Sequence, residues 1–151
     1  MLQIKALDAT FPIGNQLGEE QSPAILVNVF EIAPEDEAAL LRAWEGDATW
    51  MKRQPGYIST QLHRAVGASR LYLNYAVWES VAHFRAAFTH PDFASALSHY
   101  PSSAVAAPHL FRKLAVANLC TEWSSTSRGA VCREPPLSPS PKVRLSFGER
   151  R

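Results

Sequence analysis

Asn74 and Trp78 are the residues whose types and spacing best suit chemistry in this chain of 151 residues. Side chains alternate along a strand, so both residues of the string Asn-Tyr-Ala-Val-Trp-Glu-Ser face the same way. About 13 Å of strand separates their backbones, which leaves room for a flat molecule of two or three rings between an amide and an indole N–H donor. Asn28 adds a third polar group, since it shares a face with Leu26 and Phe30 in another apolar run.

Each of these polar side chains also has a purely structural interpretation. A buried amide costs about 1 to 3 kcal/mol unless it finds a hydrogen-bond partner, and either the protein or a ligand supplies that partner. Asn28 and Asn74 could bond to each other, to the backbone or to a buried water. Trp78, at the end of a strand, could serve as a core plug.

The common catalytic motifs are absent from the sequence. It contains no Gly-x-Ser-x-Gly motif, no glycine-rich phosphate loop, no His-Glu-x-x-His and no Cys-x-x-Cys pair. The histidines are scattered, and none pairs with a second histidine or a carboxylate at metal-ligand spacing on one predicted element. We therefore expect no metal site. The histidines are His63, His83, His90, His99 and His109.

Charge and cysteine content narrow the partners and the compartment. The formal net charge is +1, which gives no electrostatic reason to expect nucleic acid or an anionic membrane as a partner. Two cysteines are too few for a disulfide framework, and the N-terminus lacks the charged-then-apolar order of a secretory signal. No apolar run approaches the roughly 20 residues of a membrane-spanning helix. We expect a soluble, cytoplasmic protein.

Four strands are predicted in the central part of the chain. Residues 25–32 form a nearly continuous β-branched and aromatic run, typical of a strand buried on both faces. Residues 57–66 and 71–78 predict an antiparallel hairpin about Gly67, and residues 109–118 predict a last strand.

Two helical segments alternate with these strands. Pro34 and the acidic residues after it open the first helix, and Ser80 caps the second, which a further turn from Pro91 extends. The order βαββαβ predicts an α+β fold of ferredoxin-like topology. The first helix shows one apolar stripe, formed by Leu41, Trp44, Ala48 and Met51.

The two ends of the chain differ from the predicted domain, residues 24–119. Residues 1–23 show neither strand nor helix rhythm and predict an N-terminal arm, with a short strand near residues 2–6. Residues 120–151 are rich in serine and proline and hold six basic and three acidic residues. Such a segment cannot offset its ordering entropy by burial, so we expect a basic, disordered tail.

Sheet burial predicts a partner of identical sequence. Helices cover one face of a sheet in this topology, yet the first strand is apolar on both faces, because Val27 and Val29 alternate with Leu26 and Phe30. We expect the helix-free face to meet a second copy of the chain in an isologous homodimer. The alternative is a monomer covered by its own N-terminal arm.

Three motifs together resemble the antibiotic biosynthesis monooxygenase family. They are Val-Asn-Val-Phe at residues 27–30, Met-Lys-Arg-Gln-Pro-Gly-Tyr at residues 51–57, and the Asn-Tyr-Ala-Val-Trp-Glu-Ser string at residues 74–80. The resemblance covers about residues 24–118 and implies a dimeric α+β barrel, in agreement with the homodimer expected from sheet burial.

The anthrone oxygenases of this family imply a particular site. They use no metal, flavin or other prosthetic group, and the Asn and Trp of their corresponding strand match Asn74 and Trp78. Their Tyr on the following helix and their later Arg fall on Phe84 and Ser98, so this chain departs from their pattern at two polar positions. This resemblance implies that no cofactor is required.

A second branch of the family degrades heme. It uses an Asn on the first strand, matched by Asn28, with a Trp and an axial His whose positions fall on Ala87 and Leu97. Without that axial His, iron has no protein ligand there unless His90 or His99 substitutes. Heme degradation therefore ranks below the cofactor-free reaction.

The resemblance implies a cofactor-independent monooxygenase acting with O2 on an electron-rich aromatic substrate, an anthrone, phenol or quinol. Asn74 and Trp78 are then the catalytic residues, with Asn74 donating to a carbonyl or phenolate oxygen and Trp78 holding the substrate or O2. The base could be His83, His90 or His99. The expected substrate-binding residues are Asn28, Tyr72, Phe84, Phe88 and His99.

Two other functions are compatible with the same residues. A module of this fold could bind an aromatic or quinone-like metabolite without turning it over, and the missing Tyr and Arg favour that alternative. A structural dimer is the other, and a pocket filled by the chain's own Phe and Trp side chains would indicate it.

Overall fold

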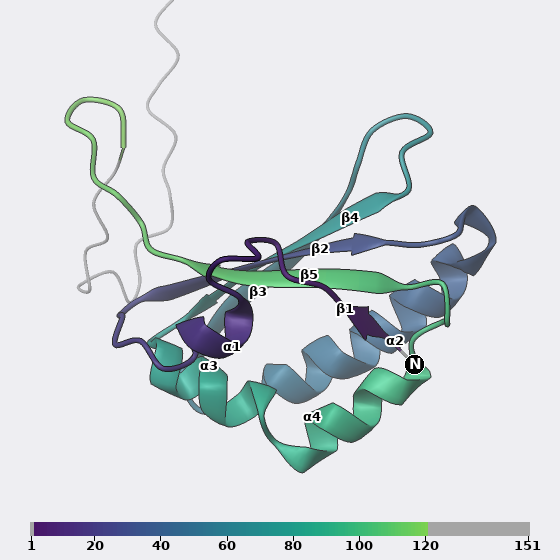
Figure 1. Ribbon diagram of the computed structural model, residues 1–151, viewed down its shortest axis with the longest axis horizontal. Helices are drawn as coiled ribbons and strands as arrows, with labels where there is room; N and C mark the ends of the chain where they lie inside the picture. The colour runs from purple at the N-terminus through teal and green to yellow at the C-terminus, as the bar shows by residue number, and fades with distance from the viewer. Residues whose placement is uncertain (1, 121–151) are drawn as a thin grey trace, which may run out of the picture.

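The computed structural model describes residues 2–120, which form a five-stranded sheet with helices on one face (Figure 1). The strands are β1 (Gln3–Ile4), β2 (Ala24–Glu31), β3 (Tyr57–Arg64), β4 (Leu71–Trp78) and β5 (Val105–Phe111). The helices are α1 (Ile13–Gln16), α2 (Glu37–Met51), α3 (Val81–Phe88) and α4 (Pro91–Ala96), with 3-10 turns η1 (Pro34–Asp36) and η2 (Leu97–His99). The βαββαβ order from β2 to β5 confirms the predicted ferredoxin-like, α+β fold.

The central strand of the sheet is β2, which pairs antiparallel with β4 on one side and β5 on the other. In this register Asn28 lies directly opposite Asn74 on β4 and Pro108 on β5. Leu26 and Phe30, its neighbours on the same face, are buried beneath the helices. The sheet therefore brings two amides from distant parts of the sequence together on the helix-covered face.

The last strand begins and ends earlier than predicted, because β5 spans Val105–Phe111 rather than residues 109–118. Its first half is rich in alanine, which has low strand propensity, and it contains Pro108. Ala104 and Ala106 are nevertheless fully buried against Phe30 and Tyr100. Small side chains let the strand approach these rings closely, and the compact packing outweighs local propensity.

The inward face of α2 also differs from the predicted stripe. Its buried residues are Leu40, Ala43 and Asp47, whereas Leu41 is 41% exposed. The prediction that Leu41 faces inward is wrong. The inward stripe includes the charged residue Asp47, so it does not show as an apolar pattern in the sequence. The stripe passes through 40, 43 and 47, as expected for a helix of 3.6 residues per turn.

The N-terminal arm protects the free edge of β5. The predicted short strand is present as β1, which pairs with β5 in parallel. Beyond that pairing, the Gln16 side chain of α1 accepts from the Leu110 backbone N–H at 2.8 Å and donates to the Leu110 carbonyl at 2.9 Å. An amide side chain thus replaces a neighbouring strand at an edge that could otherwise pair with another chain.

The helix-free face of the sheet remains partly open in a single copy. Leu71, Tyr75 and Phe111 lie on this face and are 41%, 39% and 43% exposed. The homodimer expected at this face stays a prediction. Among the helices of the described part of the chain, none is long and apolar enough to cross a membrane. The predicted tail lies outside the described residues, apart from Cys120.

The turn before β3 depends on Gly56. Its φ is +79°, and a Cβ at this position would lie 2.2 Å from Cγ of His83. We expect Gly56→Ala to lower the free energy of unfolding by about 1 to 3 kcal/mol, because left-handed backbone and steric overlap both oppose the added methyl.

Gly67→Ala is the matched control for Gly56, since Gly67 also has positive φ, +69°, but has open space around it. It should cost only the backbone part, about 1 kcal/mol in urea unfolding. Equal losses for the two variants would mean that the His83 ring moves aside without cost.

Candidate active site

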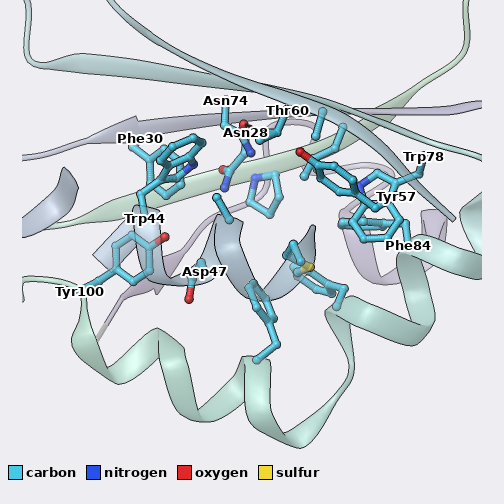
Figure 2. Close-up of a pocket in the computed structure, with 17 residues that line it drawn as sticks. Asn28, Phe30, Trp44, Asp47, Tyr57, Thr60, Asn74, Trp78, Phe84 and Tyr100 are labelled. Atoms are coloured by element: carbon cyan, nitrogen blue, oxygen red, sulfur yellow. Dashed lines mark hydrogen bonds between the residues drawn. The ribbon is translucent and has the colours of Figure 1, made fainter. Parts of the chain in front are cut away.

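A cavity of about 70 Å³ lies between the sheet and the helices (Figure 2). It is lined by side chains from β2, β3 and β4 above and from α2, α3 and α4 below. Its aromatic lining residues are Phe30, Trp44, Tyr57, Trp78, Phe84, Phe88, Phe93 and Tyr100. Four further polar side chains interrupt this apolar wall: Asn28, Asp47, Thr60 and Asn74.

The two amides form the polar centre of the sheet-side wall. The Thr60 hydroxyl donates to Asn74 Oδ1 at 2.6 Å, which fixes the plane of the amide and leaves its NH2 group as a donor. Asn28, directly opposite on β2, has a buried Oδ1 that finds no hydrogen-bond partner within residues 2–120. An orphaned acceptor costs free energy, so the site offers both a donor and an acceptor to a polar ligand atom.

Trp78 forms one end of the cavity. It is 1% exposed, and its ring makes edge-on contacts with Tyr57 and Phe84, each at a centroid distance of 5.6 Å. These contacts fix the indole plane, and Figure 2 shows the indole nitrogen on the side toward the cavity. The same side chain is therefore both a core residue and part of the cavity wall.

Asp47 forms part of the opposite, helix-side wall. It is 7% exposed, and burial raises the pKa of its carboxyl from 3.8 to about 6, against the opposing effects of the Tyr100 hydroxyl and the positive charge of His99. Burial and the neighbouring Asp47 charge raise the pKa of Tyr100 in turn, so this phenol stays protonated and acts as a donor. The sequence analysis missed Asp47, because an acidic residue within a helix usually faces solvent.

The structure brings together most of the predicted site residues. Those around the cavity are Asn28, Asn74, Trp78, Phe84 and Phe88. Tyr72 is buried beyond Phe30, where its hydroxyl interacts with Glu37 and Arg64, and it does not line the cavity. His99 is exposed and lies on the outer side of the helix layer.

The cavity is also lined by residues that were not predicted as site residues. Thr60 lies on β3, two residues before Leu62, which pairs with Asn74 on β4. Only the register of these two strands shows that the Thr60 hydroxyl reaches the Asn74 amide. Trp44 belonged to the predicted apolar stripe and lines the cavity. Tyr100 follows η2, in a stretch where no element was predicted.

The histidines lie away from the cavity. None of its lining residues is a histidine, and residues 2–120 hold no group of three or more His, Cys, Asp or Glu that could bind a metal ion. His90 caps α4 and packs on Trp50 at a ring distance of 5.2 Å. His83 bonds Ser80 at the start of α3. A heme, which needs a large cavity and an axial ligand, does not fit these residues.

Comparison with known proteins places the chain among its relatives. Residues 23–98 match the family described as antibiotic biosynthesis monooxygenase. The chain belongs to this family. A search of curated proteins gives no match at a significant level.

Several solved structures have the same fold. SnoaB, a cofactor-independent oxygenase from Streptomyces nogalater, has a TM-score of 0.57 at 25% identity, over 65% of this chain and 99% of its own. A candidate monooxygenase from Shewanella loihica PV-4 has a TM-score of 0.55 at 32% identity, over 66% and 100%. Rv0793 from Mycobacterium tuberculosis, at 15% identity and a TM-score of 0.53 over 64% and 99%, shows the fold alone. Together they confirm the resemblance inferred from the three sequence motifs and support a monooxygenase-type protein.

Proposed function

We propose that this protein is a cofactor-independent monooxygenase that transfers one oxygen atom of O2 to an electron-rich aromatic substrate, an anthrone, phenol or quinol. The observation that carries the proposal is the pair of amides, Asn28 and Asn74, facing an apolar cavity in which the Asn28 oxygen lacks a partner among residues 2–120. A phenol O–H satisfies this acceptor, and a phenolate or carbonyl oxygen accepts from the Asn74 NH2. Similarity to the oxygenase SnoaB supports the same reaction class.

The chemistry needs orientation and charge stabilisation from the protein. An anthrone methylene loses a proton, and the resulting anion transfers an electron to O2. The two radicals combine at the same carbon, and loss of water leaves a ketone, so that substrate and O2 give quinone and water. Asn74 donates to the oxygen on which the anionic charge collects, in a dry site where such a bond is stronger than in water. Trp78 places its N–H at the end of the cavity, toward the second oxygen atom or O2.

The cavity volume sets a condition on substrate entry. About 70 Å³ is less than the roughly 150 Å³ that accommodates one benzene ring, so an aromatic substrate must displace part of the wall. Trp44, Met51 and Phe88 are only partly buried and line the cavity from the helix side. These side chains are the ones that can move without opening the sheet.

A non-catalytic aromatic-binding module is the second candidate. Phe84 and Ser98 stand where the oxygenase resemblance implies a Tyr and an Arg. Phe84 lines the cavity without a hydroxyl, and Ser98 is exposed and bonds Ser95. Both differences remove polar groups, and a binding protein would not need them.

Oxygen uptake by the chelator-treated protein separates these functions. Dithranol, a dihydroxyanthrone, and methylhydroquinone are the probes, and the uncatalysed rate of each is subtracted. We expect oxygen consumption to rise in proportion to protein concentration with at least one probe. Quenching of tryptophan fluorescence by both probes without added oxygen uptake would favour the binding module. A Soret shift on heme titration would instead favour the heme-degrading branch.

We further expect the enzyme to act as a cytoplasmic homodimer, paired through the helix-free face of the sheet. Exposed Leu71 and Tyr75 on this face supply the apolar surface that a second copy would cover.

A further inference from the structure

Asp47 lies in the helix-side wall of the cavity. It is the one charged residue that is buried in the described chain, and it lines two spaces at once. On its inner side is the cavity with Asn28 and Asn74. On its outer side is a surface groove that it shares with Arg42, Arg53 and His99. Asp47 is the one residue that lines both the aromatic cavity and this basic groove.

We propose that Asp47 is the general base of this site: its carboxylate accepts the proton that the aromatic substrate loses in the cavity and releases it to solvent through the outer groove beside His99. This assignment rests on the proposed oxygenase function. The step is a proton transfer without redox change: substrate and carboxylate give substrate anion and carboxylic acid. The acid then returns its proton to water in the outer groove.

The geometry matches what a base requires in this reaction. In the proposed binding mode the amides of Asn28 and Asn74 hold the substrate oxygen at the sheet, and the ring system occupies the cavity between the sheet and α2. Figure 2 shows Asp47 on the helix side of the cavity, below Asn28 and beside the Tyr100 ring. Asp47 is therefore the carboxylate that a substrate bound in this cavity can reach. The histidines that the sequence suggested as bases do not line the cavity.

The groups around Asp47 suit a base that works near neutral pH. Burial is the main cause that raises its pKa to about 6, a value that already includes the opposing effects of Tyr100 and His99, and a base in this range is both deprotonated near neutral pH and able to accept a proton. The Tyr100 hydroxyl and the His99 charge act in the opposite direction and keep the carboxylate accessible. Arg42 and Arg53 line the outer groove and add positive charge on that side.

A purely structural role is the competing explanation, because the Asp47 and Tyr100 pair also joins α2 to the end of η2. That role would make Asp47 important for folding and leave proton transfer unaffected. The two roles differ in kinetics and in pH dependence, which the experiment measures.

Anaerobic stopped-flow absorbance tests the proposal. Dithranol is mixed with the full-length protein without O2, and the rate at which the anion band of the bound probe appears is followed from pH 5 to pH 8. We expect Asp47→Asn to slow this rate about 100-fold or more, with the affinity for dithranol changed only a few-fold. Asp47→Glu should restore part of the rate. Glu45→Gln, which removes an exposed carboxylate from the same helix, is the control and should match the wild type.

Two neighbouring variants give a readout that a structural role would not produce. The wild-type rate should fall on the acid side with a midpoint near pH 6. Tyr100→Phe and His99→Gln each remove a group that lowers the Asp47 pKa, so both should move this midpoint to higher pH. An Asp47→Asn variant that ionises dithranol at the wild-type rate, or midpoints that do not move, would overturn the base assignment alone. A wild-type protein that neither binds nor oxygenates dithranol or methylhydroquinone would overturn the proposed function, and the base assignment with it.

Discussion

The Asn74→Ala variant is expected to lose about 100- to 1000-fold in kcat/KM for the aromatic substrate while remaining folded. Its amide is the donor placed to stabilise the anionic oxygen, and removal of one such donor from a dry site typically costs this much. Alanine leaves a small space beside Thr60, and the loss of packing there is modest because the amide already borders the cavity. Steady-state oxygen uptake over a range of substrate concentrations measures the loss.

Two further variants define the origin of this effect. Thr60→Val keeps the shape of the side chain and removes the 2.6 Å hydrogen bond that orients the Asn74 amide, so we expect a smaller loss, about 3- to 10-fold. Asn15→Ala removes an exposed amide from α1, distant in the sequence from Asn74, and should leave the rate unchanged. An Asn74→Ala rate within two-fold of the wild type would show that Asn74 has no part in turnover.

The Asp47→Asn variant is expected to be more stable than the wild type at pH 8 and about equally stable at pH 4. The pKa of the Asp47 carboxyl is about 6 in the folded chain, above its ordinary value of 3.8. A raised pKa stabilises the folded state fully below pH 4, and this contribution disappears as the pH rises through 6. Above that pH the buried charge costs on the order of 3 kcal/mol, which a neutral amide avoids.

Urea unfolding at pH 4, 6 and 8 measures this difference, with Glu45→Gln as the exposed control that should show none. A gain in stability at pH 8 combined with slower proton transfer would mean that the folded chain retains a costly charge because the reaction uses it. If Asp47→Asn were less stable than the wild type at pH 8, the bonds to the carboxylate would outweigh its burial, and a structural role would explain its position.

Most of the fold could be predicted from the sequence because its patterns are local. Alternating apolar residues, the acidic start of the first helix and the glycine between the hairpin strands each specify an element through near neighbours. The last strand could not be placed correctly, since Ala106 is a strand residue for a tertiary reason, its packing with Ala104 against Phe30 and Tyr100. Intrinsic propensity gives no sign of that contact.

Only part of the candidate site could be predicted from the sequence, for a similar reason. Asn74 and Trp78 share a strand, so their common face follows from the alternation of side chains, and Asn28 joins them through pairing of β2 with β4. Asp47 and Tyr100 face the cavity from elements whose inward side depends on how the helices pack. An acidic residue in the middle of an amphipathic helix is normally assigned to solvent, and only the packed structure shows it buried.

In the proposed reaction, oxygen transfer occurs in the cavity bounded by Asn74 and Trp78, with the protein itself as the catalyst. Single-turnover oxidation of dithranol under 18O2, with chelator-treated protein and mass analysis of the product, tests it most directly. We expect one 18O atom in each quinone formed, at a rate that falls both in Asn74→Ala and in Trp78→Phe, which retains an aromatic ring and removes the N–H. Quinone formed no faster than in buffer, or formed equally fast by both variants, would contradict it.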